Sequence, residues 1–190
     1  MTGKTIDDLV PGDRAELVRV VETGDVGAFV DAVGDRNPVH SDRGYAATTP
    51  FKEPIAPGIF TAGLISAVIG TELPGPGAIY LSQSLTFVRP VKIGDAITAR
   101  VEVVDVLRER NRVHLRTLCL NQRGEEVLSG EAWVTPSRVP VEYETTMGCR
   151  GAMSLWALQP WAPVAHALSV WGLLGLVTLA RGLATSGGRR

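Results

Sequence analysis

The sequence predicts an α+β fold in which an antiparallel sheet wraps around one long helix. Residues 59–73 are apolar on nearly every face of a helix and are followed by a Pro-Gly-Pro-Gly run, which stops a helix. Residues 78–135 then contain four runs of strand character separated by turn signals. Consecutive strands with short connections favour an antiparallel meander, and a helix that is apolar all round must be enclosed by other elements.

The N-terminal third is predicted to hold one strand and two short helices. Residues 15–21 are rich in valine and leucine and predict the strand. Thr23 is an acceptable N-cap for a short amphipathic helix that ends at Gly34. The apolar residues of this helix recur at helical spacing: Val26, Phe29, Val30 and Val33. The Ser-Asp pair at 41–42 can cap a further helical turn over residues 45–47.

Turn residues separate the four predicted strands of the sheet. These strands are residues 78–88, 96–107, 113–120 and 127–135. The third strand contains His114, which is expected on the strand surface, and Cys119, which is expected to be an inert buried thiol because its neighbours are apolar.

Composition limits the classes of function. The chain has 190 residues, 45% of them hydrophobic, and a formal net charge of −1, which fits one well-buried domain with an appendage. The basic residues are scattered among acidic ones, so no nucleic-acid partner is expected. Cys119 and Cys149 lack CxxC spacing and the N-terminus does not resemble a secretion signal, which favours a reducing, cytoplasmic location.

The chain is predicted to divide into a domain at residues 1–145 and an apolar extension at 146–190. Residues 151–180 contain no Asp, Glu, Lys or Arg. Within them, residues 164–180 form a borderline candidate for crossing a bilayer, which takes about 20 residues, and arginines follow as a cytosolic flank would. The alternatives are a helix that packs on the domain or a partner, and a terminus whose reading frame does not belong to the domain.

A short motif, Asp35-x-Asn37-Pro38-x-His40, places a carboxylate and an imidazole five positions apart. On a continuous helix these two side chains would point about 140° apart. Pro38 forces the chain to bend, because it lacks an N–H and pushes the preceding residue toward extended geometry. The Asn37 side chain can satisfy backbone groups that the turn leaves open. The motif therefore predicts a small acid and base site.

Four stretches of the sequence resemble the MaoC-like, (R)-specific enoyl-CoA hydratases, also called the hydratase 2 family. They are Gly-Asp-Arg-Asn-Pro-Val-His at 34–40, Pro-Ile-Ala-Pro-Gly at 54–58, Leu-Pro-Gly-Pro-Gly-Ala-Ile-Tyr-Leu at 73–81, and Phe-Val-Arg-Pro-Val-Lys-Ile-Gly-Asp at 87–95. The resemblance covers about residues 8 to 137, in order and at the family's spacing. The C-terminal extension lies outside it.

The resemblance implies a hot-dog fold, usually paired as a homodimer with active sites near the subunit interface. It implies reversible addition of water to a trans-2-enoyl-CoA, giving an (R)-3-hydroxyacyl-CoA, with acyl-CoA as the substrate and no metal or redox cofactor. By position, Asp35 and His40 are the catalytic pair, and Asn37 lies with the substrate-binding residues.

Two further site residues follow from the resemblance. Gly58 would offer its backbone N–H to the thioester oxygen, at a helix start where this group is unpaired and the helix dipole is positive. Ser66 occupies the position of an active-site serine in the family. The chain departs from many relatives at Pro57, where they have histidine, and at Val33, where they have a small or hydroxyl residue. Both departures concern the shape of the pocket.

Three alternative functions remain open at this point. A (3R)-hydroxyacyl-acyl-carrier-protein dehydratase of fatty-acid synthesis runs the same chemistry backward, and Arg89 or Lys92 could suit the phosphates of either carrier. A hot-dog thioesterase is less favoured, because Glu72 is the only carboxylate visible on the long helix. A non-catalytic partner subunit would have no physical need for both Asp35 and His40.

Overall fold

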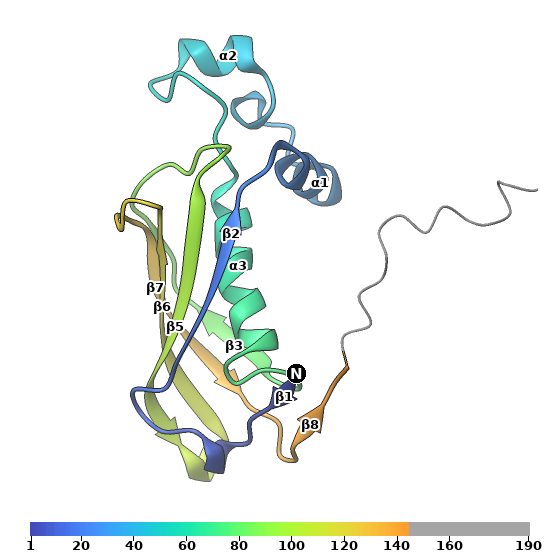
Figure 1. Ribbon diagram of the computed structural model, residues 1–190, viewed down its shortest axis with the longest axis vertical. Helices are drawn as coiled ribbons and strands as arrows, with labels where there is room; N and C mark the ends of the chain where they lie inside the picture. Colours follow the sequence, from blue (N-terminus) through green and yellow to red (C-terminus); the bar gives the residue numbers. More distant parts are fainter. Residues whose placement is uncertain (145–190) are drawn as a thin grey trace, which may run out of the picture. The chain divides into compact units, whose positions relative to one another are not determined.

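The main sheet is antiparallel throughout and curves around helix α3 (Gly58–Thr71), as the computed structural model, which describes residues 1–144, shows (Figure 1). Its strands follow the spatial order β2-β5-β6-β7-β3, with β4 also paired to β7. The strands are β2 (Arg14–Val20), β3 (Ile79–Gln83), β4 (Thr86–Phe87), β5 (Ala96–Leu107), β6 (Arg112–Leu120) and β7 (Glu126–Thr135). This is the hot-dog arrangement, so the predicted α+β fold is confirmed.

The core lies between the sheet and α3. Side chains on β5 alternate between buried and partly exposed, as expected for a strand with one face against a core. On β6 the same alternation buries Val113, Leu115, Thr117 and Cys119. Four residues of α3 pack against these strands and β2: Thr61, Ile65, Val68 and Ile69.

Helix α3 is buried on one face and open on the other. Gly63, Ser66 and Gly70 lie on the open face and are exposed, so the expectation that the helix is enclosed on all sides is wrong for the described part of the single chain. The sheet covers only the face that carries the large β-branched side chains. The remaining face consists mainly of small residues, which expose little apolar area.

The strand predicted at residues 78–88 is divided into β3 and β4. The interruption lies at Ser84, whose carbonyl oxygen would be 1.9 Å from a Cβ at Gly130 on the neighbouring strand. The lack of a side chain at Gly130 lets the two backbones approach. A register shift between Tyr80 and Ser82 further bends β3.

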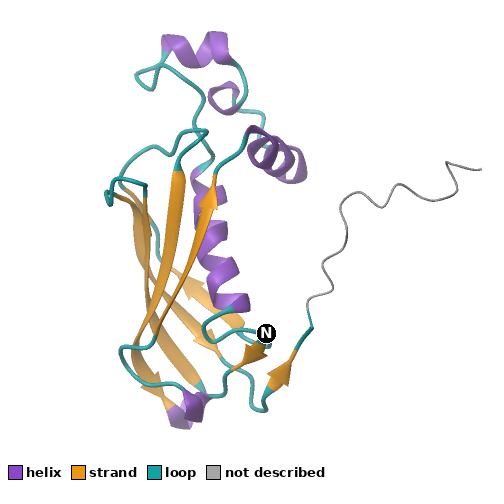
Figure 2. Cartoon of the chain, viewed as in Figure 1, coloured by secondary structure: helices purple, strands orange, loops and turns teal. Residues whose placement is uncertain are grey.

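The short helices lie at one end of the sheet, beside the N-terminus of α3 (Figure 2). Helix α1 (Thr23–Val33) begins one residue earlier than predicted, with Glu22 rather than Thr23 as its N-cap, and Gly34 ends it at φ +74° as expected. Helix α2 (Arg43–Thr48) is capped by Asp42, whose Oδ1 accepts from the Tyr45 N–H at 3.0 Å.

The remaining elements are short. They are β1 (Thr2–Gly3) paired with β8 (Val141–Glu142), and three 3₁₀ turns, η1 (Ile6–Asp8), η2 (Pro38–His40) and η3 (Arg108–Arg110). Within residues 1–144, no helix is both long and apolar enough to cross a membrane. The predicted extension at 146–190, with its candidate span at 164–180, lies outside the described residues.

Candidate active site

The turn after α1 brings Asp35 and His40 together. His40 Nε2 lies 3.5 Å from Asp35 Oδ2, with the His40 side chain 10% exposed and the Asp35 side chain 37% exposed. The imidazole is therefore shielded from bulk water while the carboxylate lies at the mouth of the site. The structure thus gives the pair the close approach that the motif predicts.

Local hydrogen bonds build this turn. Asn37 is extended at φ −63° and ψ 119°, as Pro38 requires of the residue before it. The Asn37 side-chain oxygen accepts from the Val39 N–H at 3.3 Å, and Asp35 Oδ1 accepts from the Asn37 N–H at 3.1 Å. In this chain Asn37 shapes the turn that carries the acid and the base.

One backbone contact fixes the protonation pattern of His40. Its Nδ1 lies 2.7 Å from the Ile55 carbonyl oxygen. A carbonyl cannot donate a hydrogen bond, so Nδ1 carries the proton and the neutral ring has its lone pair on Nε2. That lone pair faces Asp35 Oδ2. Two acceptors at 3.5 Å cannot bond each other directly, but both can accept from one water molecule.

Gly58 faces the same small cavity as the acid and base. This cavity of about 240 Å³ is lined by Asp35, His40 and Gly58, together with Phe29, Val33, Pro57 and Ile59. Gly58 is the first residue of α3. Within residues 1–144 its N–H has no acceptor in hydrogen-bond range. A hydrogen-bond donor at the positive end of the helix dipole therefore lies beside the pair.

The two departures from the family pattern both line this cavity. Val33 is 58% exposed at the end of α1, and Pro57 precedes α3. Their side chains are apolar, so they add no competing acid or base to the cavity.

Ser66 is not brought to this site within the chain. It lies eight residues after Gly58, or about 12 Å along the helix, on the open face of α3. Ser66 therefore does not contact this site within one subunit.

Two features of the site have no plain signal in the sequence. Ile55 acts through its carbonyl oxygen, and a backbone contact across 15 residues leaves no trace in residue type. Phe29 lines the cavity and its ring meets Phe60 edge-on at 6.0 Å. The sequence indicated Phe29 only as one of the apolar residues that recur at helical spacing in α1.

A second, larger cavity adjoins the small one at Gly58 and Ile59. It measures about 450 Å³, and Gly58 and Ile59 line both cavities. Ile55, Phe87 and Arg89 are among its other lining residues. Gly58 therefore lies at the boundary between the two cavities.

Two residues singled out from the sequence lie outside this site. His114, on β6, stacks on Trp133 at 4.6 Å between ring centroids and pairs with Glu131 at 3.2 Å. Cys119 is fully buried, as predicted, and burial raises the pKa of its thiol to about 12.

The fold and the site define a hot-dog protein with an Asp and His pair beside the N-terminus of its central helix. The chain belongs to the MaoC-like domain family, whose model matches residues 12–120. It is 47% identical over 138 residues to a 3-hydroxybutyryl-CoA dehydratase of Methylorubrum extorquens, covering 73% of this chain and 85% of that protein.

Two further comparisons agree with this membership. An (R)-specific enoyl-CoA hydratase of Rhodospirillum rubrum is 46% identical, with 70% of this chain and 92% of the relative covered. The solved structure of the R-hydratase PhaJ1 from Pseudomonas aeruginosa, in its unliganded form, superposes with a TM-score of 0.71. It is 44% identical and covers 75% of this chain and 93% of its own.

Proposed function

We propose that this protein is an (R)-specific enoyl-CoA hydratase, a hydro-lyase that adds water reversibly to trans-2-enoyl-CoA thioesters and forms (R)-3-hydroxyacyl-CoA. One observation carries the proposal: His40 Nε2 and Asp35 Oδ2 lie 3.5 Å apart in a cavity that Gly58 also lines. Within residues 1–144 the N–H of Gly58 has no hydrogen-bond acceptor. The similarity to relatives named for enoyl-CoA and 3-hydroxybutyryl-CoA supports the substrate class.

The proposed reaction begins with a water molecule held between the acid and the base. His40 Nε2 accepts a proton from this water as its oxygen attacks C3 of the enoyl group, and the Ile55 carbonyl stabilises the imidazolium through Nδ1. Asp35 accepts the second hydrogen bond of the water and orients it. A proton returned from the pair to C2 completes the addition. The proton delivered to C2 balances the proton taken from the water, and the other hydrogen of the water stays on the new C3 hydroxyl, so the sum of the reaction balances.

The Gly58 N–H is proposed to bind the thioester oxygen, where negative charge develops as C3 is attacked. Donors of this kind contribute about 2.7 to 4 kcal/mol to the transition state in other enzymes. Addition of water transfers no electron to an acceptor, and the pair handles each proton. We therefore propose that the reaction uses neither a metal nor a redox cofactor.

The test is a direct assay of the purified full-length protein with crotonyl-CoA. Loss of the conjugated enoyl absorbance should follow addition of enzyme, and chiral analysis should show the (R)-3-hydroxy product. His40→Gln should abolish the activity. His114→Gln is the matched control, because His114 lies on the sheet away from the cavity. An inactive wild-type protein, an (S) product, or full activity of His40→Gln would overturn the proposal.

We further propose that two copies of the chain form a homodimer across the open face of α3 and the edge strand β3. Ile79 is 62% exposed and Leu81 is 45% exposed on that edge, which leaves apolar surface in water. In such a dimer, Ser66 can approach the site of the partner subunit, which its distance from Gly58 prevents within one chain.

Leu81→Lys should convert the dimer to a monomer in size-exclusion chromatography with light scattering, because it places a charge in the apolar contact. Val18→Lys is the matched control, since Val18 is 66% exposed on β2 at the opposite edge of the sheet. A monomeric wild-type protein, or an unchanged dimer of Leu81→Lys, would exclude this interface. We also propose a cytoplasmic location, which fractionation of cells expressing the full chain would check.

A further inference from the structure

His40 lines a third cavity in addition to the small one. This cavity, which we call the polar cavity, measures about 270 Å³. It is formed by α1, by the turn at η2 and by the segments that carry Pro54 and Ile93, and its lining includes Thr23, Gly27, Val30, His40, Ser41 and Arg43. Of residues 1–144, His40 is the one that lines both the small and the polar cavity. Its imidazole therefore forms part of the boundary between them.

Helix α1 presents different residues to the two cavities. Phe29 and Val33 line the small cavity, whereas Gly27 and Val30 line the polar cavity. Val30 is 7% exposed and the His40 side chain is 10% exposed, so both are shielded from bulk water. At His40, a single side chain separates the two cavities.

The walls of the two cavities differ in their affinity for water. Apart from the acid and base, the small cavity is lined by apolar side chains and by Gly58, and Val33 and Ile59 in this lining are more than half exposed. A thioester bound there covers this apolar surface and displaces the water next to it. In the polar cavity, the Ser41 hydroxyl and the Arg43 guanidinium make no hydrogen bond to a protein group within residues 1–144. These two groups therefore bind water.

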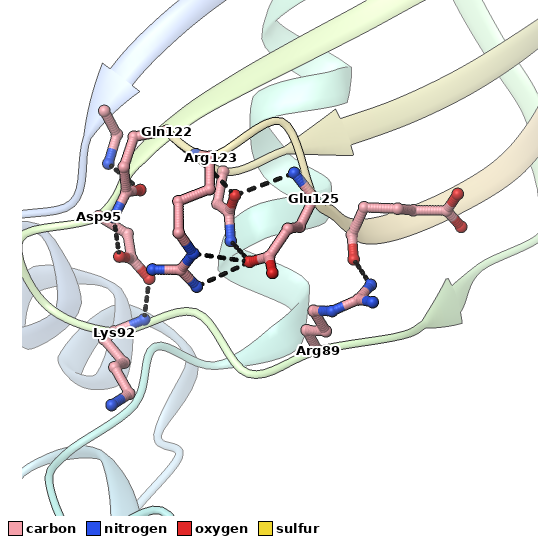
Figure 3. Close-up of polar contacts among 9 residues, drawn as sticks. Arg89, Lys92, Asp95, Gln122, Arg123 and Glu125 are labelled. Atoms are coloured by element: carbon pink, nitrogen blue, oxygen red, sulfur yellow. Dashed lines mark hydrogen bonds and ion pairs between the residues drawn. The ribbon is translucent and has the colours of Figure 1, made fainter.

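Hydrogen bonds hold the wall of the polar cavity that carries Ile93. Asp95 Oδ2 accepts from the Lys92 N–H at 2.8 Å, and Asp95 Oδ1 accepts from the Gln122 side-chain amide at 2.7 Å, as Figure 3 shows. Gln122 belongs to the turn between β6 and β7. The bonds of Asp95 therefore attach this wall to the main sheet.

His40 is also held in place at the boundary. Its Nδ1 donates to the Ile55 carbonyl at 2.7 Å, and its Nε2 lies 3.5 Å from Asp35 Oδ2. The nitrogen that accepts a proton from the reacting water thus belongs to a ring that also lines the polar cavity. A water molecule has to pass only the edge of this ring to move from the polar cavity to the acid and base.

We propose that the polar cavity is the route by which water enters and leaves the site while a thioester occupies the small cavity. This inference rests on the proposed function, since hydration consumes a water molecule in each turnover and dehydration releases one. With a separate route, the water exchanges with the solvent while the thioester stays bound. If water and thioester shared the mouth of the small cavity, the thioester would have to leave first.

Isotope exchange at equilibrium distinguishes the two routes. The full-length protein is incubated with crotonyl-CoA and (R)-3-hydroxybutyryl-CoA at their equilibrium ratio. Two rates are measured: transfer of an oxygen label from water into the hydroxyl group, and transfer of a carbon label between the two thioesters. Sucrose is added until the carbon rate falls in proportion to viscosity, so that release of the thioesters limits it. The oxygen rate should then exceed the carbon rate, by about twofold where the two thioesters leave at similar rates.

Gly27→Leu should remove this difference. A Cβ at Gly27 meets no atom within 4 Å, so a leucine side chain can occupy the polar cavity without displacing α1. The oxygen rate should fall to the carbon rate, while the carbon rate and KM for crotonyl-CoA stay as in the wild type. Gly27→Ala fills less of the cavity and should give an intermediate ratio.

Gly24→Leu is the matched control and should keep the ratio of the wild type. Gly24 also lies on α1 with room for a Cβ, but it does not line the polar cavity. Both leucine variants replace a glycine of this helix, so they raise helix propensity alike. A difference between them therefore reports on the filling of the cavity.

The two labels also separate this inference from the proposed function. Exchange of neither label by the wild type would overturn the proposed function, and this inference with it. Equal rates in the wild type, or an excess of the oxygen rate that survives Gly27→Leu, would overturn the water route and leave the hydratase proposal intact. If Gly27→Leu slows both labels equally, Ser41→Leu decides, because it fills the cavity from the side of η2. A lower ratio in that variant supports the route, and an unchanged ratio or another equal loss overturns it.

Discussion

The Asp35→Asn substitution tests whether the Asp35 carboxylate takes part in proton transfer or only supports the turn that carries it. Asp35 Oδ1 accepts from the Asn37 N–H at 3.1 Å, and an asparagine side-chain oxygen can keep that bond. The other oxygen, Oδ2, faces His40 Nε2 at 3.5 Å and becomes an NH₂ group. This group cannot take up a proton, and it donates to the lone pair of Nε2 that the water needs.

The expected effect is large on catalysis and small on folding. Loss of a general acid or base costs roughly 10²- to 10⁴-fold in rate, which corresponds to about 3 to 5 kcal/mol of transition-state stabilisation. The Asp35 side chain is 37% exposed and its turn bond is retained. The free energy of unfolding should therefore change by no more than about 0.5 kcal/mol.

The assay is hydration of crotonyl-CoA, with urea denaturation run on the same preparations. Asp31→Asn is the control, because Asp31 lies on α1 shortly before the turn that carries Asp35, is 72% exposed and pairs with Arg36 at 3.3 Å. It should leave both measurements unchanged. Wild-type turnover in Asp35→Asn would refute the role of the carboxylate in the reaction. A parallel loss of stability and activity would show that the carboxylate is needed for the fold instead.

Two further expectations concern the pocket and the core. Val33→Ala widens the small cavity and should raise kcat/KM for trans-2-hexenoyl-CoA relative to crotonyl-CoA roughly 10-fold; an unchanged ratio would mean that the acyl chain does not pass Val33. In a Cys149→Ser background, Cys119 should not react with a thiol reagent at pH 8 until the protein unfolds, because burial raises its pKa from 9.0 to about 12. The folded state keeps a proton that the unfolded chain loses, so Cys119 should lower stability as the pH rises from about 9 to about 12, relative to Cys119→Ala.

The sequence predicts those parts of the site that depend on local backbone preference. Pro38 determines the extended geometry of Asn37, Gly34 ends α1, and Asp42 caps α2, and each of these preferences acts over three residues or fewer. The strands of the sheet are equally readable, because alternating burial produces alternating residue types.

Contacts between distant segments are what the sequence does not display. The division between β3 and β4 depends on the approach of Ser84 to Gly130, and a glycine in a strand does not reveal which backbone it admits. The sequence also does not indicate that one face of α3 is open, because the same small apolar residues occur in a helix face covered by a sheet and in one covered by a second subunit. Ser66 illustrates this, since it lies in a helix of uniformly apolar character.

The segment before α3 joins the base and the oxyanion donor into one unit. Pro54 and Pro57 have no N–H, and the two N–H groups between them are both bonded: Ile55 donates to the Val39 carbonyl at 3.2 Å, and Ala56 donates to the Val91 carbonyl at 2.8 Å. The first free N–H after this segment is therefore that of Gly58. The carbonyl of Ile55, meanwhile, accepts from His40 Nδ1 at 2.7 Å.

This pairing explains why a Pro-x-x-Pro-Gly segment suits the chemistry. Each proline removes a donor that would otherwise need a partner and fixes the backbone close to φ −65°. The backbone groups that remain serve three purposes: attachment to the neighbouring segments at Val39 and Val91, orientation of the base and stabilisation of the thioester oxygen. Because a single rigid segment performs the last two, a displacement of Ile55 moves the imidazole and the oxyanion donor together. The two halves of the site therefore keep their relative position even if the segment as a whole shifts.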